Sequence, residues 1–543
     1  LSVSSTSNLG ADVTTTSTQT YTSGVTLSGG DRTLTASTVN FGSTLAGGTH
    51  GLTITGILDL DGAATDLSTL SVSGTSNLGA DVTTTGDQTY SGAAVLSSNV
   101  ILTTTANGSV YFGSTLDGGY NLNITTNGTG DVTFVGAVGG ITPLGDITIS
   151  TNEFNAASIT AGNLNITNTG AGSITGIITD AAVDNTLALI KAGSATLTLS
   201  ANNTFTGDTT ISSGDLAVGG SGKLGGGSYG GAIAIASGST LSYSSSASQT
   251  FSGSISGDGD IEKITSASST LTISGANTYT GGTVGAAGTI KAGSSYSTGP
   301  PTTDAFGTGS LTIATGAVLD LNGQTINNVT TISGTGITAS GAITNSNASA
   351  ATLQNNLILA ADSSIGGANN VTLSGVISGA YNLTKVGSST YTLSGTNTFT
   401  GDLTISVGTV TVSGTLHNDV DVLNSGTYDV DTTDTINSLS GSGAVELNTG
   451  ITLTTGDANN QTISGVISGA GNLTKVGNGI LVLSGANTYL GDTTISAGTI
   501  TLTGSVNTLT DLSIASGATL DLQSIQTFAT LDLDGTITRS AGS

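Results

Sequence analysis

The sequence predicts an all-β protein, a right-handed parallel β-helix (β-solenoid) of roughly 25 turns. One observation is a repeat: residues 372–414 and 462–504 align over 43 positions without a gap, and 28 are identical. The other is the alternation of apolar residues with Thr, Ser or Gly inside the repeat, as in 390–394 and 403–412, which is typical of half-buried strands. Such short strands bury little alone, so we expect the copies to stack as turns, right-handed because of crossover sterics.

Within the longer repeat, the segments Gly-Ala-Asn-Thr-Tyr and Ser-Ala-Gly-Thr separate the strands. We expect both segments to be turns, because Gly and Asn accept positive φ. Looser copies lie at 189–220 and 261–293. The copies at 372 and 462 are 90 residues apart, which predicts four turns of about 22 residues each.

A second repeat occupies residues 1–150. Residues 1–21 return as 70–90, with 18 of 21 positions identical. The spacing of 69 residues predicts three turns per copy, of about the same length. Residues 151–188 have no clear copy and are interpreted as transition turns. We expect residues 189–543, which carry the longer repeat, to continue the first solenoid.

Two segments interrupt the pattern, the Gly-rich residues 219–231 and residues 294–306, which contain Pro300 and Pro301. Proline cannot donate a hydrogen bond to a strand ladder, so the second segment is predicted to be a loop extruded from one turn. Neither segment is long or polar enough to indicate a flexible domain linker.

The composition excludes several classes of function. Charged residues are 8% of the chain and the formal net charge is −26, so nucleic-acid binding, which needs clustered Lys and Arg, is not expected. Direct membrane insertion is not expected, because no apolar run is long enough for a spanning helix. Without Cys there is no disulfide or thiolate metal site. The start at Leu1, without a signal peptide, favours a mature fragment of a longer secreted chain.

The few residues that could carry chemistry are scattered. The two histidines, His50 and His417, lie in different repeats and are predicted to be solvated turn residues. A lysine recurs in the longer repeat, and a basic stripe for an acidic glycan is the alternative to a corner residue whose ammonium stays in water. These lysines are Lys191, Lys263, Lys385 and Lys475. Catalytic, cofactor-binding and metal-binding residues are therefore predicted to be absent.

Pairs of aspartates in the pattern Asp-x-Asp place two carboxylates on one strand face, about 7 Å apart. The pairs are Asp59/Asp61, Asp419/Asp421, Asp429/Asp431 and Asp532/Asp534. β-Helix polysaccharide-degrading enzymes use such carboxylates together with Arg or Lys, but the two arginines, Arg32 and Arg539, lie at opposite ends of the chain. An adventitious Ca²⁺ site is the other alternative.

Three further patterns have a structural and a functional interpretation. Thr-Thr-Thr runs at 14–16, 83–85 and 103–105 would suit ice binding only if they recurred on successive turns, and they look scattered. Aromatic residues after Asn-Thr are predicted to be packing rather than a sugar-binding strip. These are Phe205, Tyr279, Phe399 and Tyr489. Asn-x-Ser/Thr sequons, such as Asn123, are expected by chance.

The residues Leu-Thr-Lys-x-Gly (473–477), Leu-Ser-Gly-Ala-Asn-Thr-Tyr (483–489) and Gly-Asp-Thr-Thr-Ile-Ser-Ala-Gly-Thr (491–499) resemble the autotransporter-associated β-strand repeat. This repeat is found in passenger regions of Gram-negative autotransporters. Residues 1–150 are similar to the arrays of filamentous-haemagglutinin-like adhesins.

These resemblances imply a non-enzymatic extracellular stalk or fibre-forming segment of a bacterial surface adhesin, attached at the cell surface or outer membrane. Its expected partners are neighbouring segments of a longer chain, head-to-tail copies of itself, or a host or cell-surface glycan or protein. The alternatives are a polysaccharide-degrading enzyme and an ice- or glycan-binding module.

Overall fold

The computed structural model describes residues 1–182, 186–265 and 267–540. The chain forms two compact units. Unit 1 comprises Leu1–Leu271 and Tyr279–Gly281, and unit 2 comprises Thr272–Thr278 and Gly282–Ser543. About 27 turns of parallel β-strands make up the two units, and the described residues contain no α-helix, only the 3-10 turns Gly225–Gly227 and Ile337–Ala339. The predicted all-β parallel solenoid is confirmed.

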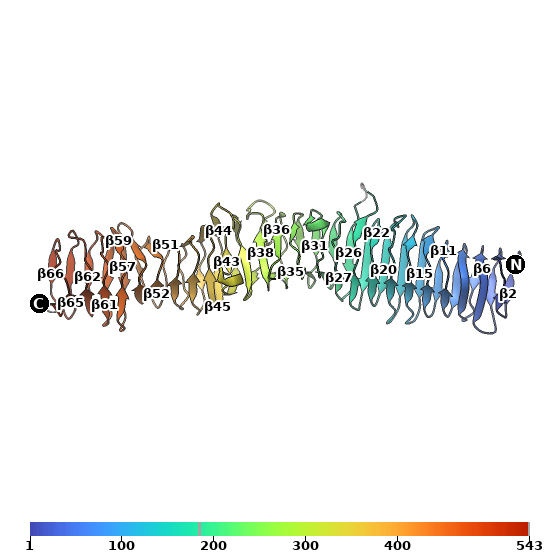
Figure 1. The fold of residues 1–543 in the computed structure, drawn as a ribbon, viewed down its shortest axis with the longest axis horizontal. Helices are drawn as coiled ribbons and strands as arrows, with labels where there is room; N and C mark the ends of the chain where they lie inside the picture. Colours follow the sequence, from blue (N-terminus) through green and yellow to red (C-terminus); the bar gives the residue numbers. More distant parts are fainter. Residues whose placement is uncertain (183–185, 266, 541–543) are drawn as a thin grey trace. The chain divides into compact units, whose positions relative to one another are not determined.

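The strands of unit 1 form three faces, which we number in the order that the chain visits them. Figure 1 shows the strands of successive turns lying side by side. Face 1 begins with β1 (Ser2–Val3) and β4 (Gln19–Tyr21), which pair in parallel. Face 2 is a 13-stranded sheet from β2 (Ser7–Leu9) to β34 (Ile255–Gly257). Face 3 begins with β3 (Val13–Thr14), which pairs with β6 (Arg32–Phe41).

Unit 2 also shows three faces over its regular part, and these are numbered 4 to 6. Face 4 includes β48 (Leu383–Lys385), β50 (Leu403–Ile405) and β52 (Asp421–Asn424). Face 5 is an eight-stranded sheet from β41 (Thr325–Ile326) to β59 (Ile467–Gly469). Face 6 is a six-stranded sheet from β54 (Asp434–Thr435) to β66 (Leu531–Leu533).

The turns are shorter and less uniform than the predicted 22 residues. Paired residues are 17 positions apart at Asp421 and Ser438 and 29 apart at Gly288 and Ala317. Most strands have only three or four residues, because each face is narrow and a corner follows at once. β6, with ten residues, is long because it bends around a corner and serves faces 3 and 1 in succession.

The 69-residue repeat is not a whole number of turns, so the prediction of three turns per copy is wrong. β1 lies on face 1, whereas its copy β10 (Leu70–Val72) pairs with β8 (Leu52–Leu60) and β13 (Gln88–Tyr90) on face 3. One copy therefore spans three turns and two further faces. The three faces have similar strand and corner lengths, so a sequence suited to one face also fits the next.

The 90-residue repeat behaves in the same way, so the predicted four turns per copy are also wrong. β48 lies on face 4, but its copy β60 (Asn472–Lys475) pairs with β57 (Thr452–Thr455) and β62 (Thr493–Ile495) on face 6. Each copy spans four turns and two faces. Outward side chains that recur between these two copies therefore point in different directions and cannot form one stripe.

The core consists of the inward residues of every strand, and its packing follows the alternation in the sequence. In β15 (Val100–Thr104) residues 100, 102 and 104 are buried, whereas 101 and 103 are not. Four aromatic rings follow one another along the core of face 3, with ring centroids 4.8, 5.4 and 5.8 Å apart: Tyr90, Phe112, Phe134 and Phe154. Such contacts add to the stability that burial itself provides.

Short polar side chains connect successive turns at the corners. The side-chain oxygen of an Asp or Asn accepts a hydrogen bond from a backbone N–H about one turn later, at 2.8 to 3.0 Å. The pairs include Asp81 to Ile101, Asn99 to Asn121, Asp208 to Ala232 and Asn382 to Asp402. The chain has only three Glu residues, and the shorter Asp side chain fits this task. Part of the negative charge of the chain therefore comes from aspartates that have this structural role at the corners.

Candidate functional site

The recurring lysine of the longer repeat is buried. Lys191, Lys263 and Lys385 have no exposed surface, and Lys475 has 1%. The prediction that these ammonium groups stay in water is therefore wrong. Each lysine lies at an inward position at or next to the end of a short strand. In three of the copies the glycine two residues later has positive φ (82° at Gly193, 72° at Gly387 and Gly477). The chain turns back there, so carbonyl oxygens surround the ammonium.

In three copies the ammonium binds backbone carbonyls from its own turn and the next one, an arrangement that we call the lysine clamp. Lys385 Nζ donates to three oxygens at 2.9, 2.7 and 3.3 Å, those of Val386, Gly387 and Val407. Lys191 Nζ donates in the same way at 2.9, 2.9 and 3.1 Å, to Ala192, Gly193 and Ser213. Lys475 Nζ donates to Val476, Gly477 and Ala497.

The clamp is modified in the fourth copy, where Lys263 Nζ donates to the Thr265 carbonyl at 2.9 Å and to the Ser269 hydroxyl at 2.8 Å. Its ammonium also lies 5.7 Å from the ring centre of Tyr243. Desolvation lowers the pKa of Lys191, Lys263 and Lys385 to about 8, and it also lowers the pKa of Lys475. The clamp is thus a structural cation inside the solenoid, not a basic stripe for a ligand.

The asparagine of the Gly-x-Asn-Thr-Tyr/Phe segment is the second recurring polar element. Asn397 is buried, its Oδ1 accepts from the Ile377 N–H at 3.0 Å, and its Nδ2 donates to the Gly395 and Thr415 carbonyls at 3.0 and 2.9 Å. Asn203 and Asn487 make the same three bonds in their copies. One side chain therefore joins three consecutive turns.

The asparagine of this segment, which we call the corner asparagine, does not adopt positive φ. The prediction from the sequence that it would do so is wrong. None of the asparagines Asn203, Asn277, Asn397 and Asn487 is among the positive-φ residues of the described chain. Gly395, two residues before Asn397, also lacks positive φ, but a Cβ there would lie 2.3 Å from the Gly375 oxygen, so packing requires glycine in this copy; the Asn203 copy has Ala201 at the same position. The prediction holds for the Ser-x-Gly-Thr turn, where Gly408 has a φ of 79°.

The aromatic residue after Asn-Thr is packed in the core, as predicted. Phe205, Tyr279, Phe399 and Tyr489 have no exposed surface. The threonine runs are less scattered than expected, since Thr83, Thr103 and Thr125 are aligned on successive turns of face 2. Thr14, in contrast, lies on face 3. Because the repeat copies lie on different faces, the threonine runs align on a few successive turns only.

Neither histidine meets the groups that hydrolysis would need. His50 follows the turn residue Thr49 and is half-buried. His417 Nδ1 accepts a hydrogen bond from the Asp419 N–H and lies 3.6 Å from a carboxylate oxygen of the same residue. This is a contact within one turn of the chain. Across the described ranges, no three His, Cys, Asp or Glu side chains gather into a metal-binding group.

The Asp-x-Asp carboxylates are engaged by amide side chains of neighbouring turns. Asn40 Nδ2 donates to Asp59 at 2.6 Å and reaches Asp61 at 3.4 Å. Asn448 bridges Asp429 and Asp431 in the same way. Burial is the main cause that raises the pKa of Asp429. Asp421 accepts from Asn437 and Ser438 at 2.8 and 2.6 Å, and Asp532 and Asp534 are exposed. Most of these carboxylates therefore form hydrogen bonds with side chains of neighbouring turns, as structural residues of a solenoid do.

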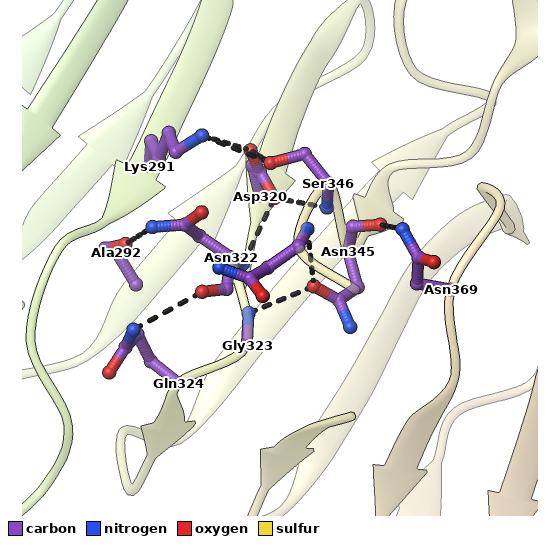
Figure 2. A network of polar contacts seen from close by, with 10 residues as sticks. Lys291, Ala292, Asp320, Asn322, Gly323, Gln324, Asn345, Ser346 and Asn369 are labelled. Atoms are coloured by element: carbon purple, nitrogen blue, oxygen red, sulfur yellow. Dashed lines mark hydrogen bonds and ion pairs between the residues drawn. The ribbon is translucent and has the colours of Figure 1, made fainter. Parts of the chain in front are cut away.

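A further polar network, which the sequence did not single out, surrounds Asp320 at the end of β40 (Ala317–Asp320). Figure 2 shows Lys291, Asp320 and Ser346 converging. Lys291 Nζ lies 3.3 Å from Asp320 Oδ2 and donates to Ser346 Oγ at 3.0 Å, while Ser346 Oγ donates to Asp320 at 2.6 Å. The Lys291 ammonium is thus paired with a carboxylate, so it is not a base for the serine. The network fastens the loop at 345–349 to the turns beneath it.

The stacked turns define the class of protein, a parallel β-solenoid. In its longer repeat, a buried lysine and a buried asparagine join successive turns by hydrogen bonds. A family model described as the passenger-associated-transport-repeat matches residues 189–218, 268–292, 383–412 and 473–502. Each of these segments contains the corner asparagine, and three also contain the clamp lysine.

A curated relative supports the same family. The adhesin BmaC autotransporter of Brucella suis biovar 1 (strain 1330) is 33% identical over 149 residues, which are 24% of this chain and 4% of that protein. The chain thus matches a small part of a much longer relative. No solved structure matches. The chain therefore carries four passenger-associated-transport repeats, as the repeat residues predicted, and is similar to an autotransporter adhesin. No helix in the described ranges has the length and apolar character needed to cross a bilayer.

Proposed function

We propose that the chain is a non-enzymatic structural and adhesive stalk, or a fibre-forming segment, of a bacterial surface protein, located outside the cell. The repeat supports this proposal, because its most distinctive polar residues are spent on holding turns together. Lys385 and Asn397 are buried and each form three internal hydrogen bonds. The Brucella relative is an adhesin, which supports the same proposal.

Beads coated with the purified chain test the proposal. We expect them to adhere to cultured animal cells more strongly than beads coated with an unrelated acidic protein, because adhesion is the activity named for the relative. The chain should release no reducing ends from pectic, sialylated or lipopolysaccharide glycans. Adhesion no better than that of the control beads would contradict the adhesive function, and depolymerisation lost on Asp429→Asn would show an enzyme.

We also propose that further turns, from a longer chain or a second copy, cover the last strands. The alternating Leu531, Leu533 and Ile537 of β66 and β67 (Thr536–Thr538) are 48%, 47% and 38% exposed, and such apolar surface favours association. Analytical ultracentrifugation of the purified chain is expected to show concentration-dependent association, and Leu531→Asp with Leu533→Asp should abolish it. A monomer at every concentration would rule out the second copy as the partner.

A further inference from the structure

One exposed tyrosine has an unusual position. Tyr111 is the outward residue of β16 (Val110–Phe112) on face 3, and it is 40% exposed. Among the described tyrosines, eight are fully buried, and Tyr120, Tyr296 and Tyr381 lie outside the strands. Tyr111 alone therefore presents a ring from the flat surface of a strand in the part of the chain that the structure describes.

The neighbours of Tyr111 leave its ring accessible. In the paired register, Thr89 precedes Tyr111 by one turn and Thr133 follows it by one turn. The ring leans across Gly113, since a Cβ on this glycine would lie 3.1 Å from Tyr111 Cε1. Val135, one turn later, is 52% exposed. The result is an apolar platform on the surface, bordered by hydroxyl groups.

Carboxylates border the same platform. Asp87 and Asp131 stand directly before β13 and β19 (Val132–Phe134), two positions from Thr89 and Thr133. Asp87 Oδ1 accepts from the Ser109 N–H at 2.8 Å, and Asp131 Oδ1 accepts from the Glu153 N–H at 2.9 Å and from Asn152 Nδ2 at 2.9 Å. These bonds fix both carboxylates and use only the Oδ1 atoms, so each Oδ2 can accept a bond from a ligand.

The dimensions suit a small ligand. Strand positions two residues apart are separated by about 7 Å, and adjacent turns by about 4.8 Å. The ring, the two threonine hydroxyls and the two carboxylates therefore occupy an area about 7 Å by 10 Å, comparable to one or two sugar rings.

We propose that Tyr111 and its border form a binding site for a neutral saccharide, which deepens the adhesive function proposed above and rests on it. The apolar face of a sugar stacks on an aromatic ring, while its hydroxyls donate to carboxylates and exchange hydrogen bonds with threonine. None of the residues named for this site is basic, and the chain carries a net charge of −26, so sialylated or sulfated glycans are repelled. The side chains of a basic peptide only donate hydrogen bonds, so they would leave the threonine hydroxyl donors without a partner. A saccharide uses both the donors and the acceptors of the site.

Saturation-transfer NMR on the whole 543-residue chain tests the site. The probes are lacto-N-tetraose, cellotetraose and mannotetraose, with sialyllactose and pentalysine for comparison. At least one neutral probe is expected to bind, and Tyr111→Ser should weaken that binding at least about tenfold, the loss of one stacked ring together with its buried area. Tyr120→Ser is the matched control, because Tyr120 is similarly exposed at 43% but lies in a turn, and it should bind as the wild type does.

The double variant Thr89→Val, Thr133→Val keeps the ring and removes the hydroxyls, so it should also weaken binding. The proposal is overturned if no neutral probe binds, if Tyr111→Ser binds as tightly as the wild type, or if pentalysine is the tightest ligand. The bead experiment separates the two proposals. Cell adhesion together with no saccharide binding leaves the adhesive function intact and disproves this site, whereas saccharide binding that depends on Tyr111, without cell adhesion, does the reverse.

Discussion

Replacing Lys385 with Met is expected to lower the local free energy of unfolding by about 2 kcal/mol. Methionine keeps the apolar stem but removes the donor for the Val386, Gly387 and Val407 carbonyls. Among the described residues, no backbone N–H donates to these three oxygens. Three charge-assisted bonds outweigh the cost of keeping the ammonium out of water, so the loss exceeds the gain.

Hydrogen exchange is the suitable measurement, because a solenoid can open locally rather than as a whole. Amides of β48 and β50 should exchange about 30-fold faster in Lys385→Met, which corresponds to the expected loss. Thr384→Met is the control, since Thr384 is the neighbouring outward residue, and it should leave exchange unchanged. Equal protection in Lys385→Met and the wild type would mean that the clamp does not stabilise the turn.

Asn397→Ala is expected to have the larger effect, a loss of about 3 kcal/mol. The substitution leaves the buried Ile377 N–H and the Gly395 and Thr415 carbonyls without their partner and opens a small cavity. Because these groups belong to three consecutive turns, the loss should spread to the turns on either side. Chemical denaturation and hydrogen exchange together measure it.

Asn397→Asp separates hydrogen bonding from shape. At neutral pH a carboxylate would face two carbonyl oxygens, so this variant should be at least as unstable as Asn397→Ala. Below the raised pKa expected for such a buried acid, the protonated form regains one donor, so its stability should increase as the pH falls. Thr398→Ala, at the adjacent exposed position, is the control. A stable Asn397→Asp at neutral pH would disprove the three-turn role of the side chain.

The fold class, the inward residues and the repeat type could all be predicted from the amino-acid sequence. Period-2 alternation settles which side chains of a strand are buried, and Phe399 and Tyr489 are packed as their positions in the repeat predicted. The absence of Cys and the low charge are likewise properties of the sequence alone. The near-identical copies revealed that one unit of structure recurs along the chain.

The face on which each repeat copy lies, and the partners of its polar side chains, could not be predicted from the sequence. β48 and its copy β60 lie on different faces, because the turns between them differ in length. The alternation within the strands does not reveal the length of each turn. Lys385 was expected in water, since a lone lysine is usually solvated. It is buried because the turn after it brings three carbonyl oxygens around one ammonium, a convergence that depends on backbone path and on the neighbouring turn rather than on local sequence.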